Sequence, residues 1–370
     1  MKSKLSLLLA AVCALAGCRG QIDDPHPDQN HEVIEGTIAL VADRDLIVAD
    51  GVDCAKFYVT ITDASGMMHD VTAHADFYIS GQSAALESNT FTSAVPVDSE
   101  VYAIYGMSVT DKVAVSAVDI AALPADKGGY DFSHRVLLLQ HTGTGCPACP
   151  YVISVLKMLS EDPNYSSRYC HVASHSYNTS DPAYNTWSER LSRTFCSGYY
   201  PDITFNFNKS TYYTMEPNDL ISLKSRISEL QSDYAAASVA ASVTYKDGKI
   251  YVNTEVKSVV DNEFNLALWV LEDGIYGKQQ GATDTWQHTH ENALRKMHGE
   301  SAVTQIYGSS VGRIKAGEKV HRVYAIDCEE KWNIENCEVV LLITSPRGGS
   351  YEQENVAVCP VGGSIEFAYK

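Results

Sequence analysis

One stretch of the sequence constrains the fold more than any other. An apolar run, residues 136–139, leads into the loop H-T-G-T-G-C-P-A-C-P. A continuous apolar run is typical of a parallel strand that is buried on both faces. The loop is followed by apolar residues at the spacing of one helical face, Val152, Val155, Leu156 and Leu159. With a further strand expected at residues 170–174, the pattern predicts a strand–helix–strand unit.

The two cysteines of this loop are the candidates for chemistry. We expect Cys146 at the helix N-terminus, where free N–H groups and the helix dipole favour the thiolate that attacks disulfides. Cys149, one turn later, is placed to close a small ring with Cys146 or to resolve a mixed disulfide. Three interpretations remain open: thiol–disulfide exchange, a permanent structural bridge, and a zinc site that also uses Cys170 and Cys196, which an exported location disfavours.

The stretch after this unit continues with helices and a strand. A polar insertion at 177–185 precedes an amphipathic stretch with Trp187, Leu191 and Phe195, and alternation around Ile203 predicts a strand with one buried face. A last helix is expected over residues 217–234.

The unit resembles thioredoxin. The resemblance extends to Tyr200-Pro201, just before the Ile203 strand, and it implies that Pro201 is a cis-proline that lies against the disulfide and positions substrate backbone. Gln140 departs from the thioredoxin pattern, because thioredoxins carry a buried acid at this position. His141 is a candidate for proton transfer or simply a hydrogen-bonded strand-end histidine.

The first residues predict export and a lipid anchor. Lys2 and Lys4 precede a short apolar run that ends in L-A-G-C at Cys18. This ending resembles the bacterial lipobox, which implies cleavage before Cys18 and its modification by acyl chains such as palmitate. Residues 1–17 are then the signal peptide and residues 18–32 an acylated, polar tether.

Charge and composition exclude several classes of function. The chain has 28 basic and 46 acidic residues, a formal net charge of −18. Such a field repels phosphate backbones, so we predict no nucleic-acid partner. No later stretch has the 18 or more apolar residues of a membrane-spanning helix.

Cysteine spacing suggests structural bridges in an exported chain. Cys13 leaves with the signal and Cys18 carries lipid. Proximity in the sequence favours Cys146–Cys149, Cys170–Cys196 and Cys328–Cys337, and elimination leaves Cys54 for Cys359.

Strand-rich regions flank the central unit. Residues 33–127 have short strands between turns and resemble bacterial immunoglobulin-like domains, with a plausible linker at 124–129. Residues 237–370 predict a second β-sandwich, with a hairpin at Asp247-Gly248 and a long inserted segment, 273–319. Residues 290–298 are expected to form a helix in that segment. We assign no metal ligands to His288, His290, His298 or Glu291, and we predict no cofactor.

As a whole, the sequence resembles the outer membrane protein 28 family of Bacteroidota lipoproteins, and His288, His290, Leu294 and Arg295 resemble a segment of that family's tail. The resemblance implies a multidomain α+β protein, anchored at the periplasmic or cell-surface side of the outer membrane: an Ig-like domain (33–127), a thioredoxin-like domain (128–236) and a C-terminal β-sandwich (237–370). Two functions follow as hypotheses. One is thiol–disulfide exchange with exported polypeptides through Cys146, Cys149 and Pro201, and the other is non-enzymatic binding of a partner with a structural disulfide.

Overall fold

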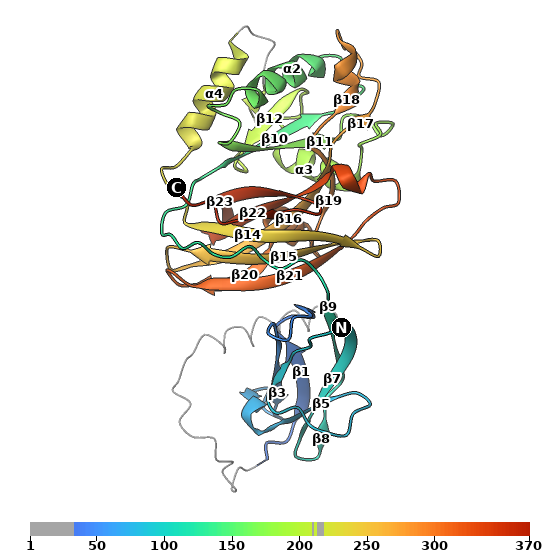
Figure 1. Ribbon diagram of the computed structural model, residues 1–370, viewed down its shortest axis with the longest axis vertical. Helices are drawn as coiled ribbons and strands as arrows, with labels where there is room; N and C mark the ends of the chain where they lie inside the picture. Colours follow the sequence, from blue (N-terminus) through green and yellow to red (C-terminus); the bar gives the residue numbers. More distant parts are fainter. Residues whose placement is uncertain (1–32, 209–210, 213–217) are drawn as a thin grey trace. The chain divides into compact units, whose positions relative to one another are not determined.

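The computed structural model describes residues 33–208, 211–212 and 218–370. The predicted signal peptide, the tether and Cys18 lie outside these residues. The chain divides into two compact units, one ending at Ile120 and the other spanning Ala121–Lys370. Both are built largely from β-sheets (Figure 1), which confirms the prediction of a β-rich chain with several domains.

The first unit consists of two sheets around one apolar core. One sheet contains β1 (Thr37–Ala42), β3 (Ala55–Thr62), β4 (Met68–Asp70) and β6 (Thr90–Phe91). The other contains β2 (Leu46–Val48), β9 (Val113–Val118), β7 (Val97–Tyr105), β5 (Asp76–Ile79) and β8 (Ser108–Val109). Alternating residues of both sheets, among them Phe57, Val59, Val101 and Ala103, are fully buried between them, as the period of two in a strand requires.

The second unit begins with the predicted strand–helix–strand pattern. Its elements are β10 (Val136–Thr142), α2 (Cys149–Ser160), β11 (Tyr169–His175), α3 (Thr186–Phe195), β12 (Asp202–Phe205), β13 (Thr211–Tyr212) and α4 (Asp219–Leu230). The strand order is β13-β12-β10-β11, with β10 and β11 parallel and β12 antiparallel to β10. Every residue of β10 is buried. The predicted helix at 217–234 corresponds to α4.

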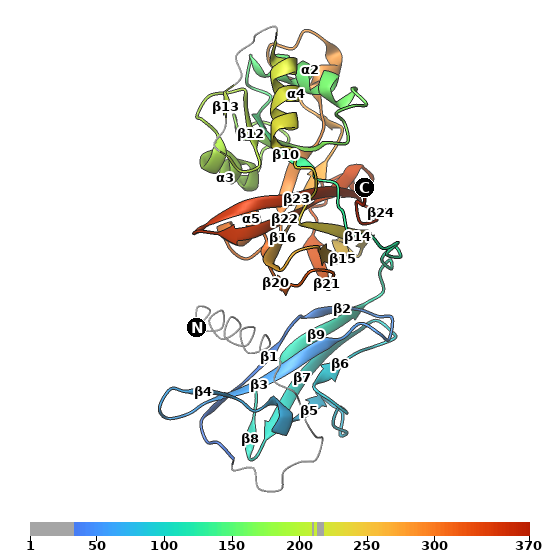
Figure 2. The same ribbon diagram turned by 90° about the vertical axis from the view of Figure 1, so that its left-hand side faces the viewer.

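Both faces of β10 are covered because the helices divide between them (Figure 2). Val136 and Leu138 pack with residues of α2 and α4. Leu137 and Leu139 pack on the opposite face with residues of α3. Asn185 caps α3 by accepting a hydrogen bond from the Ser188 N–H at 2.8 Å.

The remaining residues form two packed sheets. One holds β14 (Ala237–Lys246), β15 (Lys249–Ser258), β21 (Lys319–Asp327) and β24 (Ser364–Ile365). The other extends the β10–β11 sheet through β19 (Ala293–Met297), β16 (Asn262–Glu272), β22 (Cys337–Arg347), β23 (Ser350–Pro360) and β20 (Ser309–Ile314). The predicted hairpin joins β14 to β15. The short elements β17 (Ile275–Tyr276), β18 (Thr289–His290) and α5 (Ala302–Tyr307) complete the unit.

Two features of this region differ from the sequence prediction. Residues 290–298 contain the end of β18 and the whole of β19 rather than a helix, because Ala293 pairs with Ala173 of β11 and Glu272 of β16. The expected linker at 124–129 belongs to the second unit, where Asp126 contacts the Lys257 ammonium at 3.1 Å. In the part of the chain that the structure describes, no helix has the length and apolar character to cross a membrane.

Candidate functional site

The CxxC loop, residues 143–149, connects β10 to α2. Cys146 and Cys149 are joined by a disulfide, which confirms this predicted bridge. The helix begins at Cys149, so Cys146 lies in the turn before it rather than in its first turn. In that turn the Cys149 N–H donates to the Cys146 carbonyl at 3.3 Å.

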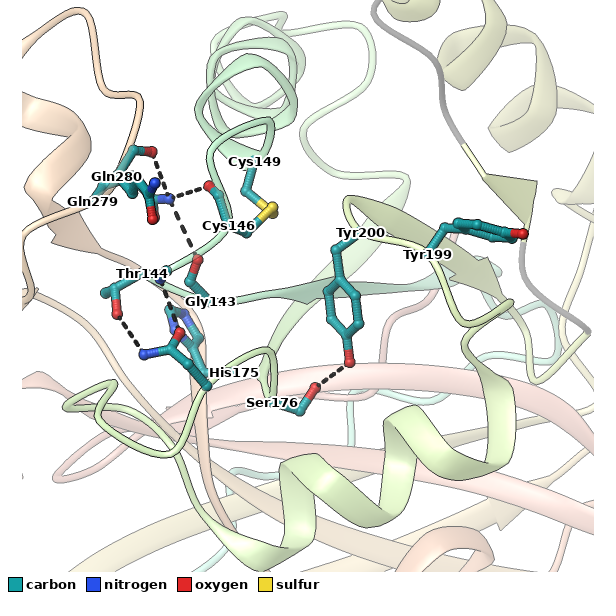
Figure 3. Close-up of a disulfide and its surroundings, with 12 residues drawn as sticks. Gly143, Thr144, Cys146, Cys149, His175, Ser176, Tyr199, Tyr200, Gln279 and Gln280 are labelled. Atoms are coloured by element: carbon teal, nitrogen blue, oxygen red, sulfur yellow. Dashed lines mark hydrogen bonds between the residues drawn. A yellow bond between two sulfur atoms is a disulfide. The ribbon is translucent and has the colours of Figure 1, made fainter.

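Both cysteines are buried, since Cys146 is 1% exposed and Cys149 is fully buried. The backbone side of the loop is held by Gln279, whose Nε2 donates to the carbonyl oxygens of Cys146 at 2.8 Å and Gly143 at 3.3 Å. Figure 3 shows the disulfide on one side of the loop and Gln279 on the other. The sulfur atoms therefore lie on the side of the loop away from Gln279.

We call residues 277–287 the covering segment, because they line the CxxC loop and the start of α2. The Gln280 N–H donates to the Thr144 carbonyl at 2.7 Å, and Gln287 Nε2 donates to the Pro150 carbonyl at 2.9 Å. Gly281 has a φ of +75°, and a Cβ there would lie 2.3 Å from the Pro147 oxygen. Only glycine fits this backbone conformation and this close approach.

A buried carboxylate anchors the loop from a different direction. Asp181 accepts hydrogen bonds from the Thr144 N–H at 2.6 Å, the Ala183 N–H at 2.8 Å and His175 Nδ1 at 2.9 Å. Burial alone would raise the pKa of Asp181, but the hydrogen bonds and charge of His175 and the two backbone donors outweigh it and hold the pKa below its usual range. Asp181 is therefore an ionised anchor of the CxxC loop.

Pro201 lies beside the loop, as the thioredoxin resemblance implies. The Tyr200–Pro201 bond is cis. Because His141 of β10 pairs with Asp202 of β12 in antiparallel register, Pro201 lies alongside Thr142, the last residue before the loop. Tyr200 shares a hydrogen bond of 3.0 Å with Ser176 and lies on the disulfide side of the loop in Figure 3.

Two of the three polar residues at the end of β10, Gln140 and His141, point to opposite faces of the sheet. His141 forms hydrogen bonds with the hydroxyl groups of Ser192 at 2.8 Å and Thr204 at 3.0 Å. Burial lowers the pKa of His141 to about 4, although the charge of Asp202 acts in the opposite direction. It is a neutral, hydrogen-bonded strand-end histidine. Gln140, where thioredoxins have an acid, accepts a hydrogen bond from His171 Nε2 at 3.1 Å.

The other predicted disulfides differ from the structure, in which these four cysteines are free thiols. Cys170 is buried in the apolar core between β11 and α3, and the Cys196 thiol instead donates to the Tyr199 carbonyl at 3.4 Å. Likewise, the Cys337 thiol donates to the Asn333 carbonyl at 3.4 Å, and that of Cys328 to the Ile326 carbonyl at 3.7 Å. Cys54 and Cys359 are also free thiols.

The histidine-rich segment that the family resemblance singled out has structural roles. His290 Nε2 donates to the Gly277 carbonyl at 3.1 Å, and the Gln279 N–H donates to His288 Nδ1 at 3.1 Å. Arg295 forms a buried ion pair with Glu272 at 2.6 Å. Among the described residues, no three His, Cys, Asp or Glu side chains come together in a way that would hold a metal ion.

Sequence reasoning did not find the residues that hold the CxxC loop, namely His175, Asp181 and Gln279. Asp181 had a usable signal in the sequence, because it is an acid in an insertion next to a predicted strand end. Its burial, which is rare for an acid, is evident only in the structure. Gln279 had none, since it is 133 residues from Cys146 in the sequence.

Comparison with known proteins agrees with the family resemblance. Residues 192–362 match the family described as outer membrane protein Omp28. This match includes Pro201 and the C-terminal sheets, but it does not reach the CxxC loop. No curated protein matches the chain.

Two solved structures from Porphyromonas gingivalis are similar to this chain. HBP35 has 16% sequence identity and a TM-score of 0.53, and the match covers 65% of this chain and 80% of HBP35. This likeness concerns the fold alone. A domain of the outer membrane lipoprotein Omp28 has 18% identity and covers 35% of this chain and 89% of that domain, but its TM-score of 0.23 supports no conclusion.

The family description agrees with the outer-membrane location that the sequence resemblance implied. Through residues 192–362, the chain is similar to the outer membrane protein Omp28 family.

Proposed function

We propose that this protein is anchored in the outer membrane through acylated Cys18 and that it exchanges disulfides with exported polypeptides. Cys146 is the attacking thiol, Cys149 resolves the mixed disulfide, and Pro201 positions the substrate backbone. Residues 33–120, which end the first unit, serve as an Ig-like domain and residues 128–236 as a thioredoxin-like domain, followed by a C-terminal β-sandwich of residues 237–370.

The observation that carries this proposal is the place of the disulfide in the fold. It lies between a buried parallel strand and the helix that follows, with Pro201 alongside the end of that strand. The strand order β13-β12-β10-β11, with α2 and α4 on one face and α3 on the other, supports the proposal of a thioredoxin-like domain. On reduction, the Cys146 thiolate would lie next to the unpaired N–H groups at the start of α2, which favour the anion.

The burial of the cysteines favours a second candidate function. A cysteine that is only 1% exposed is not accessible to another protein's disulfide without movement of the residues around it. In the alternative, the protein binds a partner without catalysis, and the Cys146–Cys149 bridge stabilises the fold.

A redox titration combined with partner trapping distinguishes the two functions. The purified mature chain is equilibrated with glutathione buffers, and Cys149→Ser is expressed in cells to retain mixed disulfides on Cys146. Exchange predicts a potential above about −300 mV and trapped polypeptides that Cys146→Ser does not retain. Cys54→Ser, which removes a thiol from the other unit, serves as the control and should leave the potential unchanged. A far lower potential with no trapped polypeptide would establish the structural bridge.

A further inference from the structure

A cavity of about 340 Å³ lies on the α2 side of the β10–β11 sheet. Its walls come from α2, from the ends of β10 and β11, and from residues 286–292. The side chains that matter here are Gln140, Thr142, His171, His175, Trp286 and His290. This volume is at the lower end of the range for small-molecule sites, roughly 300–1,000 Å³.

The cavity exists because the sheet face changes character along each strand. Val136 and Leu138 of β10 pack into the apolar core, but Gln140 and Thr142, the next two residues on that face, are polar. In the parallel β11, Ala173 pairs with Gln140. The cavity therefore lies at the carboxyl ends of parallel strands, the usual place for ligands in such sheets.

Two buried polar atoms in the wall have no partner. Gln140 is 3% exposed and Thr142 is 1% exposed. The side-chain oxygen of Gln140 already accepts a hydrogen bond from His171, but the Gln140 Nε2 has no acceptor. The Thr142 hydroxyl has no hydrogen-bond partner either. Each unmade hydrogen bond costs about 1–3 kcal/mol, so a native site that keeps both is prepared for a ligand with complementary groups.

Two of the histidines around these atoms, His171 and His290, are neutral. Burial, together with the nearby His175, lowers the pKa values of His171 and His290 to about 4. His171 and His290 each donate one ring N–H to an oxygen, so the other ring nitrogen is left as an acceptor. These two histidines therefore offer hydrogen-bond acceptors without positive charge.

The mouth of the cavity adds an aromatic surface. Trp286 is 38% exposed, and the Lys157 ammonium lies 5.4 Å from the centre of its ring. Glu291 is also at the mouth, and the whole chain carries a formal charge of −18, which disfavours an anionic ligand.

We propose that this cavity binds a small, planar, uncharged molecule that carries a cyclic amide. Its carbonyl accepts from Gln140 Nε2, its adjacent N–H donates to an imidazole nitrogen or the Thr142 hydroxyl, and its ring lies against Trp286. Uracil represents this chemical class, and the site is independent of the cysteine chemistry.

Titration of uracil into the mature chain, followed by ligand-detected saturation-transfer NMR, tests the proposal. Uracil is expected to bind saturably, and orotate, the same ring with an added carboxylate, at least about tenfold more weakly because its charge must be desolvated. Gln140→Leu is expected to weaken uracil binding about tenfold, the equivalent of one lost buried hydrogen bond. Gln82→Leu, an exposed glutamine of the first unit, should change nothing.

Trp286→Ala keeps the test decisive if Gln140→Leu does not fold, because Trp286 is at the surface and its loss should also weaken binding. The proposal is overturned if uracil does not saturate by about 10 mM. It is equally overturned if the folded variants bind uracil like the wild type or if orotate binds as tightly as uracil.

Discussion

Replacing Asp181 by Asn tests whether this buried carboxylate holds the CxxC loop. In the wild type, Oδ2 accepts from the Thr144 N–H and His175, and Oδ1 accepts from the Ala183 N–H. An Asn side chain keeps the shape but places an NH₂ group against one of these donors and removes the negative charge from the other bonds. One charge-assisted hydrogen bond is lost and the others are weakened.

The expected cost is about 2–4 kcal/mol of unfolding free energy at pH 7, because a hydrogen bond to a charged group contributes roughly 1.5–3 kcal/mol. For a unit of this size, the melting temperature should fall by roughly 5–15 °C. The measurements are urea denaturation and thermal melting of the mature chain. Asp63→Asn is the matched control, because Asp63 accepts a similar set of bonds in a solvent-accessible turn of the first unit and should lose far less stability.

The pH dependence gives an independent check. The pKa of Asp181 is lower in the folded chain than its unfolded value of about 4, so its contribution is complete above that value and is lost as the pH falls through the folded pKa. The difference between wild type and Asp181→Asn should be constant above about pH 5 and shrink below about pH 4. A loss no larger than that of Asp63→Asn, or a difference that does not shrink in acid, would refute the role of Asp181 as an ionised anchor.

Two further predictions concern the covering segment. Gln279→Ala removes the side-chain amide that donates to the backbone of the CxxC loop, so dithiothreitol should reduce the disulfide roughly 5- to 10-fold faster. The rate of reduction is measured by thiol labelling, and the control variant Gln82→Ala should leave it unchanged. Gly281→Ala should lower the melting temperature more than Gly312→Ala. Both glycines have positive φ, but only at Gly281 would an added Cβ meet the Pro147 oxygen. Equal losses of melting temperature would show that the close approach is unimportant.

The fold of the central unit was predictable where local patterns are strong. β10 had a continuous apolar run because both its faces are covered, and α2 had a clear helical period. The hairpin at Asp247-Gly248 was also predictable, since both residues adopt positive φ and few residue pairs do so at low cost.

Residues 290–298 were wrongly expected to form a helix, and the reason is physical. A short segment of mixed polar and apolar residues has no decisive period, so its pairing partners determine its conformation. Here Ala293 joins β11 to β16, and Arg295 is buried because Glu272 of β16 pairs with it. These pairing partners are distant from residues 290–298 in the sequence, and Gln279 is likewise distant from the CxxC loop that it contacts.

Burial of Cys146 lowers the rate of any exchange but does not by itself exclude it. Gln279, Gln280 and Gln287 make four hydrogen bonds to the CxxC loop and the start of α2, and opening them costs roughly 2–6 kcal/mol at 0.5–1.5 kcal/mol each. Release of these four bonds alone would then occur at about 1 part in 30 to 1 part in 20,000, within the range of ordinary local unfolding. The bond from the Thr144 N–H to Asp181 makes a fully open loop rarer still. The equilibrium potential does not depend on this access, whereas the trapping of partners does. A high potential without trapped partners would therefore point to a closed exchange site, and a low potential would point to a structural bridge.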